Sequence, residues 1–147
     1  MYANNKINKE IRNMKFTRIY LEEYLNRLPE NFKKNKKGKT YLEECLENNT
    51  AEYYIIDNNK EFFFYKKEND IVGLCVDEKG MESIFDNKKI MNAIFEFLKQ
   101  KGYKKAIISL DKNHYIKRHN LALEYGFEEK EIFKQNDFEY VNFEKNL

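Results

Sequence analysis

The fold can be inferred starting from one stretch of the sequence, Lys105-Ala106-Ile107-Ile108-Ser109-Leu110. Its short, isoleucine-rich apolar run is typical of a buried strand. A weaker helical pattern follows from Tyr115 to Tyr125 and stops at Gly126, because glycine readily adopts the left-handed conformation that ends helices. The spacing therefore predicts a strand followed by a helix that ends at Gly126.

The clearest helical pattern in the chain lies just before this strand. Its apolar side chains recur on one face, at Ile90, Met91, Ile94, Phe95 and Leu98. Asp86 or Asn87 is expected to cap the start of this helix, and Gly102 supplies its left-handed stop. Beyond Gly126, two closing strands flank an Asn136-Asp137 turn.

Four aromatic or β-branched runs precede the clearest helix, and turn residues separate them. The runs are Tyr53 to Ile56, Phe62 to Tyr65, Ile71 to Val76 and Met81 to Phe85. They predict an antiparallel meander, in which Met81 to Phe85 is the candidate fourth strand of the sheet.

The N-terminal part of the chain combines a strand with two short helices. Met14 to Ile19 is strand-like, and the helical spacing from Tyr20 to Leu28 ends at Pro29, which cannot donate to the helix ladder. Thr40 followed by Glu43 is a capping-box pattern, which predicts a second short helix.

Two polar segments lie outside these predicted elements. Residues 1–13 are weakly patterned and are expected to form a flexible extension. The run from Lys33 to Lys39 contains five lysines and is expected to be a solvated loop, although such a run also suits an acidic partner. Residues 14–147 are expected to form a single domain.

Composition narrows the class of protein. The 147 residues suit one domain, and 41% hydrophobic residues predict a packed core. A formal charge of +2 argues against nucleic acid as a partner, since phosphate binding depends on clustered cations. Apolar runs are far shorter than the roughly 20 residues of a membrane helix, so we expect a cytoplasmic protein without membrane attachment. Cys45 and Cys75 are expected to be reduced.

The predicted order of elements resembles that of the GNAT superfamily of N-acetyltransferases. The local match is strongest at Lys105 to Leu110, at Tyr125-Gly126-Phe127 and at the closing Phe143-Glu144-Lys145. The resemblance implies an α/β (α+β) fold, with a mixed, mostly antiparallel sheet of about seven strands flanked by about four helices. It covers roughly residues 14 to 145.

In that family, a glycine-containing turn before the long helix holds the pyrophosphate of acetyl-CoA. The resemblance places this turn on Asp86 to Met91, where Asp86, Lys89 and Met91 occupy the positions of the family's amide or basic residue and its two small residues. Bulk at Met91 is expected to obstruct the phosphates, whereas Lys88 and Lys89 offer cations. The implied acetyl-CoA site consists of Phe85, Asn87, Lys88, Lys89, Ile90, Met91 and Asn113.

Acetyl transfer needs a base that deprotonates the amine and an acid that protonates the leaving thiolate. On the resemblance, Glu82 on the candidate fourth strand stands where some members place a base-like carboxylate. In many members the acid is a tyrosine, and its position falls on Leu121 or Ala122 here. Neither of these side chains can donate a proton. Tyr125 and Tyr115 are the candidate substitutes for that acid.

The other reactive side chains suggest no separate chemistry. His114 and His119 lie five residues apart, which is not the spacing of a two-histidine metal face, so no metal is expected. Cys75 lies in an apolar run without an evident histidine partner, so it is not expected to be a nucleophile.

Two hypotheses remain open for the function. The first is an N-acetyltransferase that moves acetyl from acetyl-CoA to an amine. The amine would contact the segment from Tyr20 to Asn48 and the final hairpin. The alternative is a catalytically degenerate GNAT-fold module that binds or regulates, which the altered turn favours. The exposed edges of the predicted sheet also suit a homodimer.

Overall fold

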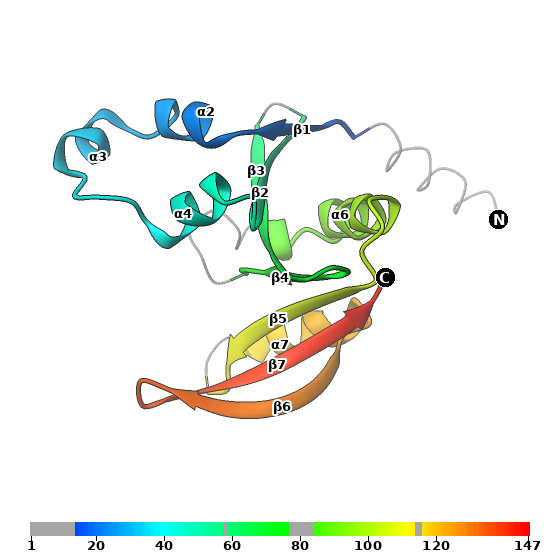
Figure 1. The fold of residues 1–147 in the computed structure, drawn as a ribbon. Coiled ribbons are helices and arrows are strands. Elements are labelled where there is room, and N and C mark those ends of the chain that lie inside the picture. The colour runs from blue at the N-terminus through cyan, green and yellow to red at the C-terminus, as the bar shows by residue number, and fades with distance from the viewer. Residues whose placement is uncertain (1–13, 58, 77–83, 114–115) are drawn as a thin grey trace.

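Seven strands form one mixed sheet in the computed structural model, which describes residues 14–57, 59–76, 84–113 and 116–147 (Figure 1). The order across the sheet is β1-β2-β3-β4-β5-β7-β6, and only β4 and β5 pair in parallel. The strands are β1 (Phe16–Ile19), β2 (Ala51–Ile56), β3 (Lys60–Glu68), β4 (Ile71–Leu74), β5 (Lys105–Asp111), β6 (Glu128–Gln135) and β7 (Phe138–Asn146).

Helices lie against both faces of the sheet. Those within the described residues are α2 (Leu21–Asn26), α3 (Glu30–Asn35), α4 (Tyr41–Glu47), α6 (Lys88–Gln100) and α7 (Ile116–Glu124). On one face, α6 stacks Phe97 on Phe16 of β1 with ring centroids 4.2 Å apart. On the other face, Tyr41 of α4 contacts Tyr65 of β3 at 5.4 Å.

The two faces follow from the alternation of side chains along the strands. Phe62 and Phe64 of β3 face α6 and are fully buried. Ile108 of β5 and its cross-strand partner Phe143 of β7 extend this core toward α7, where Phe143 meets the ring of His119. The apolar strand recognised in the sequence therefore lies in mid-sheet, between β4 and β7.

The predicted architecture is confirmed, but two local predictions are wrong. Residues Lys33 to Asn35, expected in a loop, form the second half of α3, which begins directly after Pro29. Ile84 and Phe85, expected in a strand, lie in a helical turn, while Met81 to Ser83 fall outside the described residues. The fourth strand is instead Ile71–Leu74.

The predicted helix signals are confirmed by the hydrogen bonds. Thr40 Oγ1 accepts from the Glu43 amide at 3.2 Å, and the Glu43 carboxylate accepts from the Thr40 amide at 3.1 Å, which completes the capping box. Asn87, rather than Asp86, caps α6, because its side chain accepts from the Ile90 amide at 3.1 Å.

The predicted turns also have the expected backbone. Gly102 and Gly126 end their helices with φ of 98° and 94°, which are left-handed conformations. Asn136 and Asp137 both have positive φ, as a tight two-residue hairpin turn requires.

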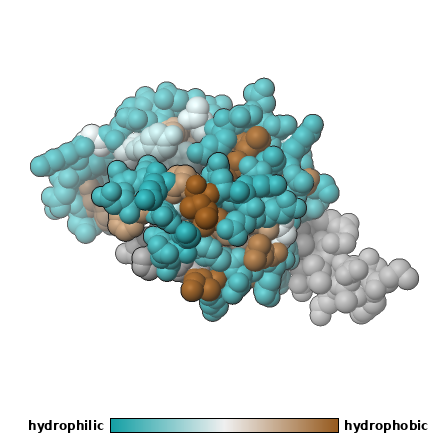
Figure 2. Space-filling view, turned by 90° about the horizontal axis from the view of Figure 1, so that it is seen from below, coloured by the Kyte–Doolittle hydropathy of each residue, from teal (hydrophilic) through white to brown (hydrophobic). Residues whose placement is uncertain are grey.

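The surface beyond the core is mostly polar. Seen from the side of the β6–β7 hairpin, hydrophobic groups are scattered among hydrophilic residues (Figure 2). Edge strand β6 carries charged side chains along much of its length, which discourages uncontrolled pairing of strands. Cys45 is buried and Cys75 half-buried, and both are free thiols. Within the described residues, no helix is long and apolar enough to cross a membrane.

Candidate functional site

The parallel strands β4 and β5 separate in the middle of the sheet. They pair at Ile71 with Lys105, at Val72 with Ala106, and at Gly73 with Ile107. Strand β4 ends one residue later, whereas β5 continues to Asp111 and pairs only with β7 over that length. The sheet therefore opens between β4 and β5 just beyond Gly73.

A cleft of about 230 Å³ lies at this opening. Its lining comes from β3, β4, β5 and the segment after β4, and consists of Tyr65, Lys67, Gly73, Leu74, Cys75, Val76, Ile107 and Ser109. Tyr65 of the cleft contacts Tyr41 of α4, and the strand pairing of Tyr65 with Gly73 and of Gly73 with Ile107 places these residues on the same face of the sheet. None of the described residues predicted for the site lines the cleft.

Gly73 allows a lysine side chain to cross the floor of the cleft. A Cβ atom added at Gly73 would lie 2.7 Å from Cε of Lys67, closer than carbon atoms approach one another. The absence of a side chain at Gly73 thus leaves space for the aliphatic part of Lys67.

Ser109 is a cleft residue that the sequence interpretation missed. Its Oγ donates a hydrogen bond of 2.5 Å to Oδ1 of Asn142, its cross-strand partner on β7. The available signal was its position, since Ser109 is a polar residue inside an otherwise apolar strand. Lys67 and Tyr65 had no comparable signal, because lysine and tyrosine are common throughout the chain.

The start of α6, predicted to hold phosphates, combines buried and exposed residues. Phe85 and Met91 are 0% and 1% exposed, and Ile90 is also buried, so their side chains belong to the core. Asn87 and Lys88 are exposed, and Lys88 Nζ lies 3.0 Å from the carboxylate of Glu124 on α7. The Met91 side chain belongs to the core, and its obstruction of phosphates stays a prediction.

Arg118 is a second cation beside this helix terminus. Its Nε lies 4.0 Å from the carboxylate of Asp86, and its side chain is only 11% exposed. Arg118 had no sequence signal, because its approach to α6 depends on how α7 packs. Lys88, Lys89 and Arg118 place three positive charges at the start of α6, with Asp86 and Glu124 as their acidic neighbours.

Tyr125 joins the end of α7 to the turn before α6. Its hydroxyl donates to the Phe85 carbonyl at 2.6 Å, and its own carbonyl accepts from Lys145 Nζ at 2.6 Å. Burial, followed by the negative charges of Asp86 and Glu124, raises the pKa of Tyr125 to about 12. The hydroxyl therefore stays protonated, but its proton is already donated to a carbonyl.

Two further predicted residues lie away from these contacts. Asn113 follows β5 and is exposed, and its backbone amide donates to the Asp111 carboxylate at 2.9 Å. Glu82, the predicted base, lies outside the described residues. His119 Nε2 lies 2.8 Å from the carbonyl oxygen of Asp111, the last residue of β5.

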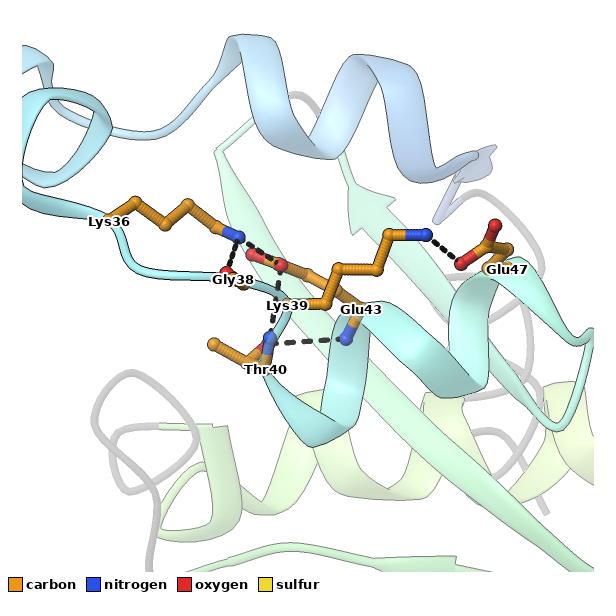
Figure 3. Close-up of polar contacts among 6 residues, drawn as sticks. All are labelled: Lys36, Gly38, Lys39, Thr40, Glu43 and Glu47. Carbon is orange, nitrogen blue, oxygen red and sulfur yellow. Dashed lines mark hydrogen bonds and ion pairs between the residues drawn. The ribbon is translucent and has the colours of Figure 1, made fainter.

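Lysines of the segment before α4 pair with acidic residues of α4 itself (Figure 3). Lys36 Nζ lies 2.5 Å from the carboxylate of Glu43, which is 1% exposed, and also donates to the Gly38 carbonyl. Lys39 pairs with Glu47. A pocket of about 430 Å³ is lined by residues of α3 and of the segment that leads from it to α4.

No protein-family model matches the sequence, and no curated protein matches it significantly. Solved structures, in contrast, share its fold. A Bacillus subtilis acetyltransferase in complex with CoA aligns over 92% of this chain and 99% of its own length, with a TM-score of 0.55 and 15% identity. The aminoglycoside N-acetyltransferase AAC(6')-Ib11 aligns over 91% and 96%, with a TM-score of 0.59 and 13% identity.

A Chromobacterium violaceum protein described as a probable acetyltransferase of the GNAT family aligns over 90% of this chain and 87% of its own, with a TM-score of 0.53 and 10% identity. Identities this low establish similarity of architecture alone. The seven-stranded sheet that opens between β4 and β5, together with these alignments, shows that the chain has the fold of GNAT acetyltransferases.

Proposed function

We propose that the protein is an acyl-CoA-dependent N-acetyltransferase, which moves acetyl from acetyl-CoA to an amine. The observation that carries this proposal is the cleft of about 230 Å³ at the divergence of β4 and β5. A slot between two strands exposes unpaired backbone amides and carbonyls, which suit an extended, amide-containing arm. A structural neighbour with this fold is a complex with CoA.

The residues near α6 fit the phosphates of CoA in part. Lys88, Lys89 and Arg118 supply positive charge at the positive end of the helix dipole. Asn87 already occupies the Ile90 amide, so that amide becomes available only if the cap moves. In the proposal, Asn87, Lys88 and Lys89 contact phosphates, Phe85, Ile90 and Met91 contribute backbone only, and Asn113 lies beyond β5.

Acetyl-CoA would supply an acetyl group activated as a thioester. The chain's own residues would exclude water from the cleft and present the amine to it from the face that carries α4. The predicted base is Glu82. The predicted acid, Tyr125, donates its proton to the Phe85 carbonyl, so the proposal does not depend on Tyr125 as the acid.

Ligand-dependent melting tests the binding half of the proposal. Acetyl-CoA, CoA and desulfo-CoA should each raise the melting temperature, since a ligand at 100 times its dissociation constant adds about 2.7 kcal/mol. Replacing half-buried Ile107 by tryptophan fills the cleft and should abolish the shift. Ile132→Trp, at a side chain 51% exposed on β6, is the matched control and should retain it.

Thiol release across a panel of amines tests the catalytic half. Turnover that depends on both acetyl-CoA and an amine is the expected result. Absence of any melting shift at millimolar CoA would contradict the proposal. A shift without thiol release from any amine would instead support the alternative, a GNAT-fold module that binds CoA without catalysis.

A further inference from the structure

Three side chains form a hydrogen-bonded chain that starts at the cleft. Ser109 on β5 donates to Asn142 Oδ1 on β7 at 2.5 Å, and Asn142 Nδ2 donates to Glu131 Oε1 on β6 at 3.0 Å. The three residues are successive cross-strand partners, which places them on one face of the sheet. Ser109 lines the cleft.

The direction of every bond in this chain is fixed by the carboxylate at its end. An ionised carboxylate only accepts hydrogen bonds, so the amino group of Asn142 must face Glu131. The carbonyl oxygen of Asn142 then faces Ser109, and a carbonyl only accepts. Ser109 must therefore donate its single proton away from the cleft, and its oxygen offers only lone pairs to a ligand.

The position of Ser109 gives this polarity a use. Ile107 is the last β5 residue that pairs with β4, and Ser109 is the next β5 residue on the same face. Its oxygen thus stands at the point where the two strands separate, on the face from which an acceptor would enter. A hydrogen-bond acceptor at this point favours a group that carries N–H.

We propose that Ser109 binds the acceptor amine, by accepting a hydrogen bond from its N–H while Asn142 and Glu131 hold the hydroxyl in the accepting orientation. This inference rests on the proposed transferase function. With one N–H held by Ser109, the lone pair of a neutral amine is free to face the thioester carbon. The negative charge of Glu131, relayed through two dipoles, also favours the positive charge that develops on nitrogen during attack.

The hydrogen-bonded side chains position the amine and do not remove its proton. A carboxamide does not pass a proton from one side to the other. Asn142 therefore prevents proton transfer between Ser109 and Glu131. Ser109 would touch the substrate, whereas Asn142 and Glu131 are positioning residues. The chain is thus independent of the base that deprotonates the amine.

Steady-state kinetics with acetyl-CoA and the best amine of the panel test the inference. Ser109→Ala should raise the KM for the amine about tenfold, the equivalent of one hydrogen bond, and leave the KM for acetyl-CoA within about twofold. Glu131→Gln should have a smaller effect in the same direction, because a glutamine amide lets Asn142 reverse and Ser109 turn its proton toward the cleft.

A rescue variant separates polarity from simple damage. In Asn142→Asp combined with Glu131→Gln, the new carboxylate accepts from both Ser109 and the glutamine, so Ser109 again offers lone pairs to the cleft. The double variant should recover the amine KM that Glu131→Gln loses. Glu144→Gln, which breaks the cross-strand ion pair with Lys105 on the same two strands, should leave both KM values unchanged.

An unchanged amine KM in Ser109→Ala, or no recovery in the double variant, would overturn the inference while the transferase proposal stands. A wild-type protein that binds acetyl-CoA but acetylates no amine would overturn both, because no acceptor would then exist for Ser109 to hold.

Discussion

The Tyr125 hydroxyl donates a hydrogen bond of 2.6 Å to the Phe85 carbonyl, across 40 residues of sequence. This bond ties α7 to the turn that precedes α6, and the rings of the two residues also pack edge to face at 5.4 Å. With its pKa raised to about 12, the hydroxyl keeps its proton at neutral pH and directs it into the protein. The geometry supports a structural role for Tyr125 rather than the predicted catalytic one.

We therefore expect Tyr125→Phe to lower the free energy of unfolding by about 1–3 kcal/mol, since the Phe85 carbonyl loses a buried donor. At saturating acetyl-CoA, kcat should change by less than about threefold. Loss of a true general acid would lower kcat about 100-fold or more. Chemical denaturation and initial rates measure the two effects. Tyr140→Phe, at a half-buried tyrosine on β7, is the control. A large loss of kcat with unchanged stability would restore the acid role.

Glu52 is a buried carboxylate surrounded by three cations. Lys66, Lys101 and Arg18 lie 2.9, 3.4 and 3.9 Å from its oxygens. Burial alone would raise the pKa of Glu52, but hydrogen bonds from Tyr54 and Lys66 and the charges of Lys101 and Arg18 outweigh it and lower the pKa to about 2. The ionised form therefore stabilises the fold.

This stabilisation has a defined pH window. A lowered pKa contributes stability that is fully present above the unfolded value of 4.5 and is lost as pH falls toward 2. Glu52→Gln should therefore cost roughly 3 kcal/mol at neutral pH, and the difference from wild type should vanish near pH 2. Urea unfolding between these pH values measures it.

Glu30→Gln is the matched control, because Glu30 forms an exposed pair with Lys33 at 3.4 Å. Exposed pairs of this kind contribute about 0–1 kcal/mol. If Glu52→Gln were no more destabilising than Glu30→Gln at neutral pH, the cations around Glu52 would only compensate its burial and not stabilise the fold.

The sequence predicted the elements whose signals are local. Periodic apolar residues indicated α6, a capping box indicated α4, and positive-φ turn residues were recognised at Gly102, Gly126 and Asn136-Asp137. Helix α3 was missed because its residues are all exposed, so no apolar face marks it. Ile84 and Phe85 were mistaken for strand because a short buried apolar run has the same composition in either structure.

The candidate site was harder to predict, since it depends on where strand pairing stops. The sequence of β4 contains no signal that its pairing with β5 ends at Gly73. The residues that resemblance assigned to the phosphate turn lie around the start of α6, whereas the cleft residues Lys67 and Ser109 come together only through the order of the strands. Local sequence patterns therefore predicted the fold, whereas the cleft could be identified only from the pairing of the strands in the structure.

Met91 provides a test of that distinction. On resemblance, a smaller residue at this position would admit phosphates, but the side chain is 1% exposed and belongs to the core. Met91→Ala should therefore leave a cavity and lower the free energy of unfolding by about 2–5 kcal/mol. Asn92→Ala, at the exposed neighbour on α6, should change it by less than about 0.5 kcal/mol. Tighter binding of acetyl-CoA without loss of stability would favour the resemblance instead.

Gly73 offers the most direct probe of the cleft. A methyl group there would meet Cε of Lys67 at 2.7 Å, and because that atom lies near the end of a flexible chain, the lysine can move aside. Gly73→Ala should therefore change stability by less than about 1 kcal/mol. The methyl group nevertheless occupies the last paired position of β4, so it narrows the cleft where it opens.

We expect Gly73→Ala to weaken acetyl-CoA about tenfold in calorimetric titration, a loss of about 1.4 kcal/mol. Combining it with Lys67→Ala removes the clash but keeps the methyl group in the cleft, so the double variant should bind as weakly as Gly73→Ala. Lys67→Ala alone should bind within about twofold of wild type, because its charge is not required in the slot. If Lys67→Ala alone reproduced the loss, displacement of the lysine rather than narrowing of the cleft would be its cause, and wild-type affinity in Gly73→Ala would move the acetyl-CoA site away from β4.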